Sequence, residues 1–246
     1  MQTTGESTAA EAPGSGTQFE FWFEFASTYS YLSAARIREL SAERGVRVVY
    51  RPFLLGPIFQ AQGWNDSPFN LYPAKGRYMW RDLERRCELY GLPFQKPTEF
   101  PRNGLRAARL ATALLADPAT ADCTPAFVAA VYSANFAEDR NIAEESVLIE
   151  LLTENLAKVP AAMPASPHNP APDAATIVSR SKSAEIKNAL RRTTEQAQEL
   201  EIFGAPSFCI RRSHDAQVAN ECELFWGDDR LEDAFDYYQS VDKTQE

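Results

Sequence analysis

Every second residue between positions 19 and 25 is phenylalanine, and the opposite face of this stretch carries Trp22. A period of two predicts a β-strand over 18–25, and an apolar residue on both faces favours a place near the centre of a sheet. A helical pattern follows over 27–44, with Gly45 as the expected end, and 46–51 has the pattern of a second strand. This order predicts two parallel strands joined by a right-handed crossover.

The middle of the chain is predicted to be helical. Apolar residues recur at spacings of three and four in five stretches within 80–200, which is typical of amphipathic helices in a bundle. Short strands are expected at 207–211 and 222–226, and a polar loop over 213–220 could close them into a hairpin. A final helix is expected from about Leu231.

The order of these elements predicts an α/β protein with a thioredoxin-like fold and a large α-helical domain inserted. We expect the thioredoxin-like domain to comprise 18–60 and 201–246, and the inserted helical domain to comprise 61–200. Within the insert, 160–172 contains five prolines and is expected to be a surface loop. Residues 1–17 are rich in Ser, Thr, Gly and Ala and are expected to form a disordered tail.

The charge balance bears on the class of partner. The 246 residues include 25 Lys and Arg against 34 Asp and Glu, a formal charge of −9. This excess argues against binding to nucleic acid or to an anionic lipid surface. No apolar run has the ~18 residues of a membrane span. The first basic residue is Arg36, and the start of the chain lacks the pattern of a signal peptide, so we expect a cytoplasmic protein.

Four cysteines are scattered along the chain, and only two histidines occur. No C-x-x-C pair and no cluster of ligands at short spacing is visible, so we predict no metal site. Sparse cysteines suit a reducing compartment, where they pack as small apolar residues. Cys209 and Cys222 could face each other across the predicted hairpin, and we interpret them as buried apolar residues that are not redox partners.

Three stretches of sequence together resemble a known family. They are FASTYSYL at 25–32, then RPFLLG at 51–56 with PAKGRYM at 73–79, then FGAPSF at 203–208 with LFWGDDRL at 224–231. In this order they are similar to the 2-hydroxychromene-2-carboxylate isomerases, which are DsbA-like proteins related to kappa-class glutathione transferases. The resemblance covers about 18–241. It implies a thioredoxin fold with a helical insert, glutathione as cofactor and a homodimer.

Ser27 matches the first serine of the family's S-P-Y-S signature, which faces the glutathione thiol, and Thr28 stands where that signature has proline. A helix start offers free N–H groups and a partial positive charge, which favour a nearby thiolate. Ser27 and Ser30 take the two positions that C-x-x-C has in redox enzymes of this shape, and serine cannot form a disulfide. The alternative is that Ser27 is only an N-cap, and both roles can coexist.

The resemblance also implies contacts to the peptide part of glutathione. It implies that the Ala205–Pro206 bond is cis, which would leave the Ala205 backbone N–H and C=O free to pair with the extended tripeptide. It implies that Asp228 and Asp229 hold the γ-glutamyl end, whereas without this context they would form an ordinary capping cluster.

The resemblance further places Lys75 near the glycyl carboxylate or a substrate acid, and Asn65 near a matching asparagine. The alternative for Lys75 is a solvated helix face. Tyr29, Trp64 and Tyr72 could wall a pocket for a flat aromatic acid, although aromatic residues at helical spacing are more often core.

Taken together, the resemblance implies a glutathione-dependent isomerase that acts on a small aromatic or conjugated acid. In such enzymes the thiolate adds to a conjugated carbon, the former double bond rotates, and elimination returns glutathione. One alternative is a kappa-like glutathione transferase that forms a stable conjugate. The other is a non-catalytic protein that binds glutathione on a thioredoxin-like fold.

Overall fold

The computed structural model describes residues 16–158, 173–212 and 222–242. The predicted disordered tail, the proline-rich loop and the predicted loop at 213–220 lie outside the described residues, apart from positions 16 and 17 of the tail. Within the described ranges, no helix combines the length and the hydrophobicity that crossing a membrane would require.

A four-stranded sheet forms the centre of the fold, with the order β2-β1-β3-β4. The strands are β1 (Gln18–Phe23), β2 (Val48–Pro52), β3 (Ser207–Arg211) and β4 (Glu223–Trp226). β1 pairs with β2 in parallel and with β3 antiparallel, and β3 pairs with β4 antiparallel. The predicted parallel pair and the predicted hairpin are therefore confirmed. β1 ends two residues before the predicted Phe25 because the chain turns there, where the Ser27 N–H donates to the Glu24 carbonyl over 2.9 Å.

The phenylalanine face of β1 packs on α1 (Thr28–Arg44) and α10 (Leu231–Asp242). Phe19, Phe21 and Phe23 have no exposed surface. The Phe19 ring lies 4.3 Å from the Phe235 ring of α10, and the Phe21 ring lies 5.7 Å from the Phe208 ring of β3. Each such side chain stabilises the fold by about 1.5–3 kcal/mol when fully buried, so this face is the main core of the sheet.

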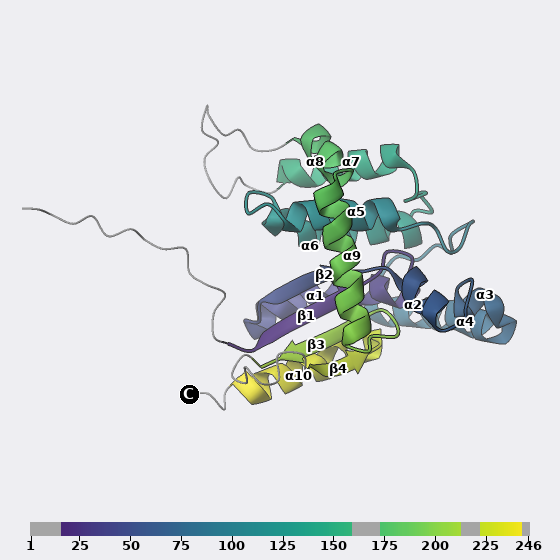
Figure 1. Ribbon diagram of the computed structural model, residues 1–246. Helices are drawn as coiled ribbons and strands as arrows, with labels where there is room; N and C mark the ends of the chain where they lie inside the picture. Colours follow the sequence, from purple (N-terminus) through teal and green to yellow (C-terminus); the bar gives the residue numbers. More distant parts are fainter. Residues whose placement is uncertain (1–15, 159–172, 213–221, 243–246) are drawn as a thin grey trace, which may run out of the picture.

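The other face of the sheet is crossed by α9 (Ala184–Glu199), as Figure 1 shows. A second apolar cluster forms here around Trp22 and Phe53 and includes Ala197 of α9 and Cys209 of β3. This arrangement explains why the strand pattern had Trp22 on its second face: both faces of β1 are covered.

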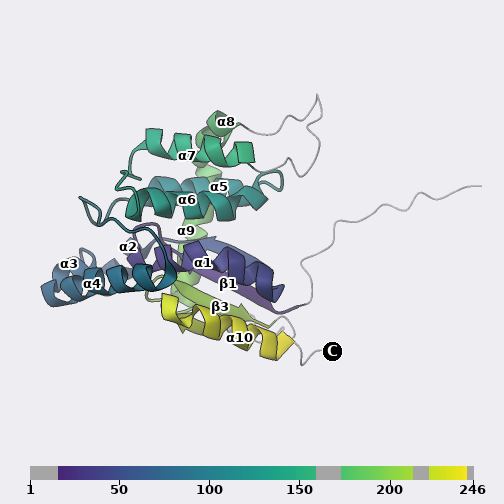
Figure 2. The same ribbon diagram turned by 180° about the vertical axis from the view of Figure 1, so that it is seen from behind.

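The remaining helices form two groups. One group stacks on the sheet layer through the contact of α6 with α1, and the other extends to one side of the sheet (Figures 1 and 2). The stacked group is α5 (Leu105–Leu115), α6 (Thr124–Phe136), α7 (Glu145–Lys158) and α8 (Ala174–Ser181). The lateral group is α2 (Leu55–Ala61), α3 (Pro68–Leu71) and α4 (Pro73–Tyr90). Two short 3₁₀ helices, η1 (Ala121–Cys123) and η2 (Asp228–Arg230), complete the elements of the described ranges.

The predicted fold class, a thioredoxin-like fold with a large helical insertion, is confirmed. The boundaries at 60 and 200 remain predictions. α1 ends as expected at Gly45, whose φ of 65° is left-handed and favours glycine.

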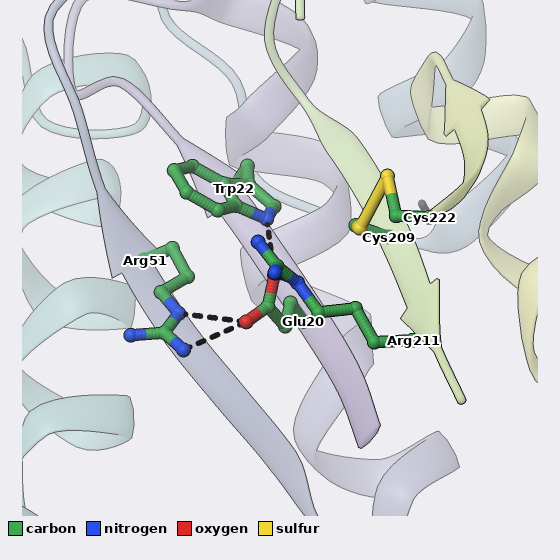
Figure 3. The surroundings of a disulfide bond; sticks show 6 residues. All are labelled: Glu20, Trp22, Arg51, Cys209, Arg211 and Cys222. Carbon is green, nitrogen blue, oxygen red and sulfur yellow. Dashed lines mark hydrogen bonds and ion pairs between the residues drawn. A yellow bond between two sulfur atoms is a disulfide. The ribbon is translucent and has the colours of Figure 1, made fainter. Parts of the chain in front are cut away.

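The interpretation of Cys209 and Cys222 as free apolar residues was wrong, because the two form a disulfide (Figure 3). Cys209 lies opposite Leu224 across the β3–β4 pair, so Cys222, two residues earlier, lies diagonally opposite on the same face. Their Cα atoms are 5.4 Å apart, within the usual range for a disulfide. Cys87 and Cys123 are free and buried, as expected.

Reduction of this disulfide is expected to lower the free energy of unfolding by about 2–3 kcal/mol. The disulfide closes a loop with a sequence separation of 13, and this restricts the unfolded chain. Urea unfolding with and without a thiol reductant measures the effect. The Cys222→Ala variant is the control, since the reductant should not change its stability. Equal stability of the oxidised and reduced parent protein would contradict this expectation.

Candidate active site

Ser27 lies at the turn from β1 into α1, and the N-cap role considered from the sequence is confirmed. It is the N-cap of α1, where its Oγ accepts a hydrogen bond from the Ser30 N–H over 3.3 Å. The same Oγ donates to the Ala205 carbonyl over 2.7 Å. Ser27 as a whole is only partly buried.

The bend before β3 has the geometry that was expected. The Ala205–Pro206 bond is cis, as predicted. The expectation that the Ala205 carbonyl is free was wrong, since this oxygen accepts the Ser27 hydroxyl 178 positions away in sequence. A carbonyl oxygen has two lone pairs, so one acceptor position remains. The hydrogen bond brings the start of α1 and the cis-proline bend into one site.

The segment that follows β4 joins the same site. The Gly227 N–H donates to the Pro206 carbonyl over 3.0 Å, which sets η2 beside the bend. Gly227 has a φ of 109°, a conformation that side chains rarely adopt. The predicted pair Asp228 and Asp229 therefore lies next to Pro206.

The two aspartates have different surroundings. Asp228 is 2% exposed, and its Oδ2 accepts a hydrogen bond of 2.7 Å from Arg86 Nε of α4. Burial raises the pKa of Asp228 to about 6, and the Arg86 guanidinium partly opposes this rise. Asp229 has a side chain that is 53% exposed. Asp229 forms only an exposed ion pair of 3.5 Å with Arg230, whereas the buried Asp228 is held by Arg86.

Glu24, which was not among the predicted site residues, lies directly before the Ser27 turn. Its Oε2 accepts a hydrogen bond of 2.8 Å from the Ala26 N–H. Burial raises the pKa of the Glu24 carboxyl to about 7, and the Ala26 N–H partly lowers it. The alternation of the strand gave no signal for this, because Glu24 has the spacing of an ordinary polar-face residue.

Because the pKa of Glu24 rises from 4.5 to about 7 on folding, the unfolded chain loses this proton first as the pH rises. The contribution of Glu24 to the free energy of unfolding should therefore decline between these two pH values and stay level above them. The Glu24→Gln variant is expected to be more stable than the parent by about 2 kcal/mol at pH 8 and to differ much less at pH 5. Urea unfolding at both pH values checks this, with Glu39→Gln on the exposed side of α1 as control. A gain of equal size at both pH values would contradict the assignment.

The structure does not bring Lys75 and Asn65 into contact with Ser27. Lys75 is exposed near the start of α4, and its Nζ lies 5.9 Å from the centre of the Tyr72 ring. Asn65 is exposed between α2 and α3 and has no hydrogen bond or ion pair with the residues that the structure describes. Their proposed roles rest on the resemblance alone.

The three aromatic residues considered for a substrate pocket lie on different elements. The Tyr29 hydroxyl donates to Asp82 of α4 over 3.0 Å, and burial is the first cause of its raised pKa. Trp64 packs on Phe59, with ring centres 5.5 Å apart, and Tyr72 is 50% exposed. Only Tyr29 belongs to the first turn of the helix that Ser27 caps.

An aromatic pair beside the cis-proline bend was missed by sequence reasoning. Phe203 and Trp226 have ring centres 4.9 Å apart and are 46% and 53% exposed. A Cβ at Gly204 would collide with the Trp226 indole, so a larger residue there would displace this side chain. Each of these aromatic residues directly precedes a glycine of the quoted motifs, which was the available sequence signal. Their contact, however, depends on the pairing of β3 with β4.

Comparisons with known proteins bear on the whole chain. The family model described as DSBA-like thioredoxin domain matches residues 18–166 and 171–239. A 2-hydroxychromene-2-carboxylate isomerase of Sphingobium xenophagum is 25% identical over 223 residues, covering 87% of this chain and 93% of the relative. Glutathione S-transferase kappa 2 of Caenorhabditis elegans is 24% identical over 229 residues, which covers 89% of this chain and 90% of the relative.

A solved structure of 2-hydroxychromene-2-carboxylate isomerase is similar in fold. Its TM-score is 0.71 at 24% identity, and the match covers 92% of this chain and 97% of that one. The relatives are enzymes, and the resemblance inferred from the three sequence stretches is confirmed. The chain belongs to the DSBA-like thioredoxin domain family.

Proposed function

We propose that this protein is a glutathione-dependent isomerase of the 2-hydroxychromene-2-carboxylate type. The observation that carries the proposal is the hydrogen bond of 2.7 Å from Ser27 Oγ to the Ala205 carbonyl, which joins a helix start to a cis-proline bend. The names of the relatives, an isomerase and a glutathione transferase, support the same class of chemistry.

The donor set at this site fits a thiolate. Position 27 is serine and position 30 is serine, so the chain has no sulfur of its own at the turn. The Ser27 hydroxyl has one proton, which it donates to the Ala205 carbonyl, so it would turn this proton to the sulfur when a thiolate binds. The first N–H groups of α1 offer further donors, and the partial positive charge of the helix start stabilises a nearby anion by about 0.3–1 kcal/mol. Glutathione, when bound, supplies the nucleophilic thiol that this site lacks.

Other residues would hold the tripeptide. The Ala205 backbone can pair with it beside Pro206, as a strand edge pairs with an extended peptide. Asp229 suits the γ-glutamyl ammonium because it is exposed, and Asp228 supports η2 through Arg86. Lys75 and Asn65 would contact a carboxylate of glutathione or of the substrate.

The substrate that this site suits is a small aromatic or conjugated acid. Tyr29, Trp64 and Tyr72 would wall the pocket, and the exposed Phe203–Trp226 pair adds an aromatic surface beside the bend. The proposal also includes a homodimer in the cytoplasm, which size-exclusion chromatography and fractionation of cells would test.

Product analysis tests the proposal and separates it from its two alternatives. The protein is incubated with glutathione and 2-hydroxychromene-2-carboxylate. The products are separated by liquid chromatography and identified by absorbance spectrum and mass, because an isomer has the same mass as the substrate. Isomerised substrate with glutathione unconsumed is the expected result. A stable adduct with glutathione consumed would indicate a kappa-like transferase. The 24% identity to a kappa-class transferase is the observation that favours this alternative. Glutathione binding without either product would indicate a non-catalytic binding protein.

A further inference from the structure

A cavity of about 250 Å³ lies in the helical group, between α5, α7 and α8. Its walls combine an apolar part with charged groups. The apolar part is formed by Leu110, Leu148 and Val178, all buried. The other lining residues are Arg106, Arg109, Glu145, Ser181 and Lys182. None of these residues belongs to the site around Ser27.

The cavity is cationic in a protein that is anionic overall. Three of its side chains are cations and one is an acid, whereas the whole chain has a formal charge of −9. Lys182 Nζ lies 2.8 Å from Glu145 Oε1, so these two charges offset each other. Arg106 donates to the Ala143 carbonyl over 2.7 Å and forms no ion pair within the described ranges, although its charge, after that of Lys182, helps to lower the pKa of Glu145.

Arg109 differs from the other two cations. Its guanidinium forms no hydrogen bond or ion pair within the described part of the chain. Its Nε is enclosed by protein, so the two Nη atoms are the donors that a ligand in the cavity can reach. A planar oxyanion is the acceptor that best matches a guanidinium, because two of its oxygens can accept parallel hydrogen bonds.

We propose that this cavity is a second binding site, for a small organic oxyanion. Arg109 and Arg106 bind the carboxylate or phosphate group, and the compact apolar body of the ligand contacts Leu110, Leu148 and Val178. A carboxylate and a phosphate would both bind to the two guanidinium groups, and the probes named below distinguish between them. The assignment does not depend on the proposed isomerase activity, since no residue is shared with the Ser27 site.

Calorimetric titration of the full-length protein tests the site with four probes: benzoate, phenyl phosphate, inorganic phosphate and benzyl alcohol. We expect at least one of the two aromatic oxyanions to bind, and more tightly than inorganic phosphate, with no binding of the neutral alcohol. Which of the two binds more tightly identifies the anionic group. Binding of benzyl alcohol with similar affinity, or equal affinity for inorganic phosphate, would overturn the assignment.

Variants locate the binding. Arg109→Gln is expected to weaken it at least about tenfold, because a charge-assisted pair is lost. Arg191→Gln, an exposed change on α9, is the matched control and should bind as the parent does. Because an aromatic acid could also enter the Ser27 site, the titration is repeated with Ser27→Asp, where the cavity site should be unaffected. Loss of binding in Ser27→Asp together with full binding in Arg109→Gln would contradict the proposal.

The control for folding is thermal unfolding of each variant without ligand. If Arg109→Gln is unfolded, Arg109→Met, which keeps the apolar stem of the side chain, replaces it. Arg106→Gln, at the exposed rim, gives a second readout and should weaken binding less than the change at Arg109. Unchanged affinity in both the Arg109 and the Arg106 variants would overturn the assignment.

Discussion

The Ser27→Ala variant is expected to lose about 10²–10³-fold in kcat/KM for the proposed glutathione-dependent isomerisation, while its fold is retained. The hydroxyl is the side-chain donor at the start of α1 that meets the cis-proline bend, through its hydrogen bond of 2.7 Å to the Ala205 carbonyl. Without it, a thiolate at this point keeps the helix charge but loses the hydroxyl proton that would turn to it from the Ala205 carbonyl. The measurement is steady-state kinetics with 2-hydroxychromene-2-carboxylate and glutathione.

Loss of the helix cap could mimic this result, so two further variants are needed. Ser27→Asp preserves an N-cap oxygen but places a negative charge beside the thiolate, so activity should fall without a comparable loss of stability. Ser33→Ala makes the same chemical change at a buried serine of α1 whose Oγ has no hydrogen-bond partner among the described residues. Its activity should match that of the parent. Full activity in Ser27→Ala would contradict the role of Ser27.

The Glu20→Ala variant is expected to lose about 3–5 kcal/mol of unfolding free energy. Glu20 has no exposed surface, and its two carboxylate oxygens accept hydrogen bonds from three side chains (Figure 3). Arg51 donates to Oε1 over 2.7 Å from Nη2, Arg211 donates to Oε2 over 3.1 Å, and the Trp22 indole N–H donates to Oε2 over 3.0 Å. Removal of the carboxylate leaves two neighbouring guanidinium groups and a buried indole N–H without their acceptor.

Urea unfolding at pH 7 measures this loss. Glu84→Ala is the matched control, because Glu84 forms an exposed ion pair with Arg81 on α4, and its removal should cost less than about 1 kcal/mol. Combining Glu20→Leu with Arg51→Met should recover part of the stability, since it removes both an acid and one of its bases. A loss below that of the exposed control would show that the buried cluster contributes little.

Much of the fold could be predicted because it depends on local patterns. The phenylalanine alternation placed β1, Gly45 marked the end of α1, and the short apolar stretches at either side of 213–220 gave the β3–β4 pair. These features depend on the period of side-chain burial and on turn chemistry, which neighbouring residues determine. The end of β1 was placed two residues late because Phe25 continues the alternation although the backbone has already turned.

The features that were missed depend on contacts between distant segments. The Cys209–Cys222 disulfide needs the diagonal register of β3 and β4, which spacing alone does not give. Asp228 is buried against Arg86, which is 142 positions earlier in the chain. The place of Ser27 at a helix start could be predicted, yet its contact with Ala205, 178 positions away, became visible only in the structure.

The most direct test of this account is the pKa of the glutathione thiol when it is bound to the protein. Thiolate absorbance in the ultraviolet, followed against pH with the parent protein and with Ser27→Ala, gives this value. We expect the bound thiol to titrate at least about one unit below the free value of about 8.5, and the shift to shrink in Ser27→Ala. A bound thiol that titrates at or above the free value, or an identical shift in both proteins, would contradict the account.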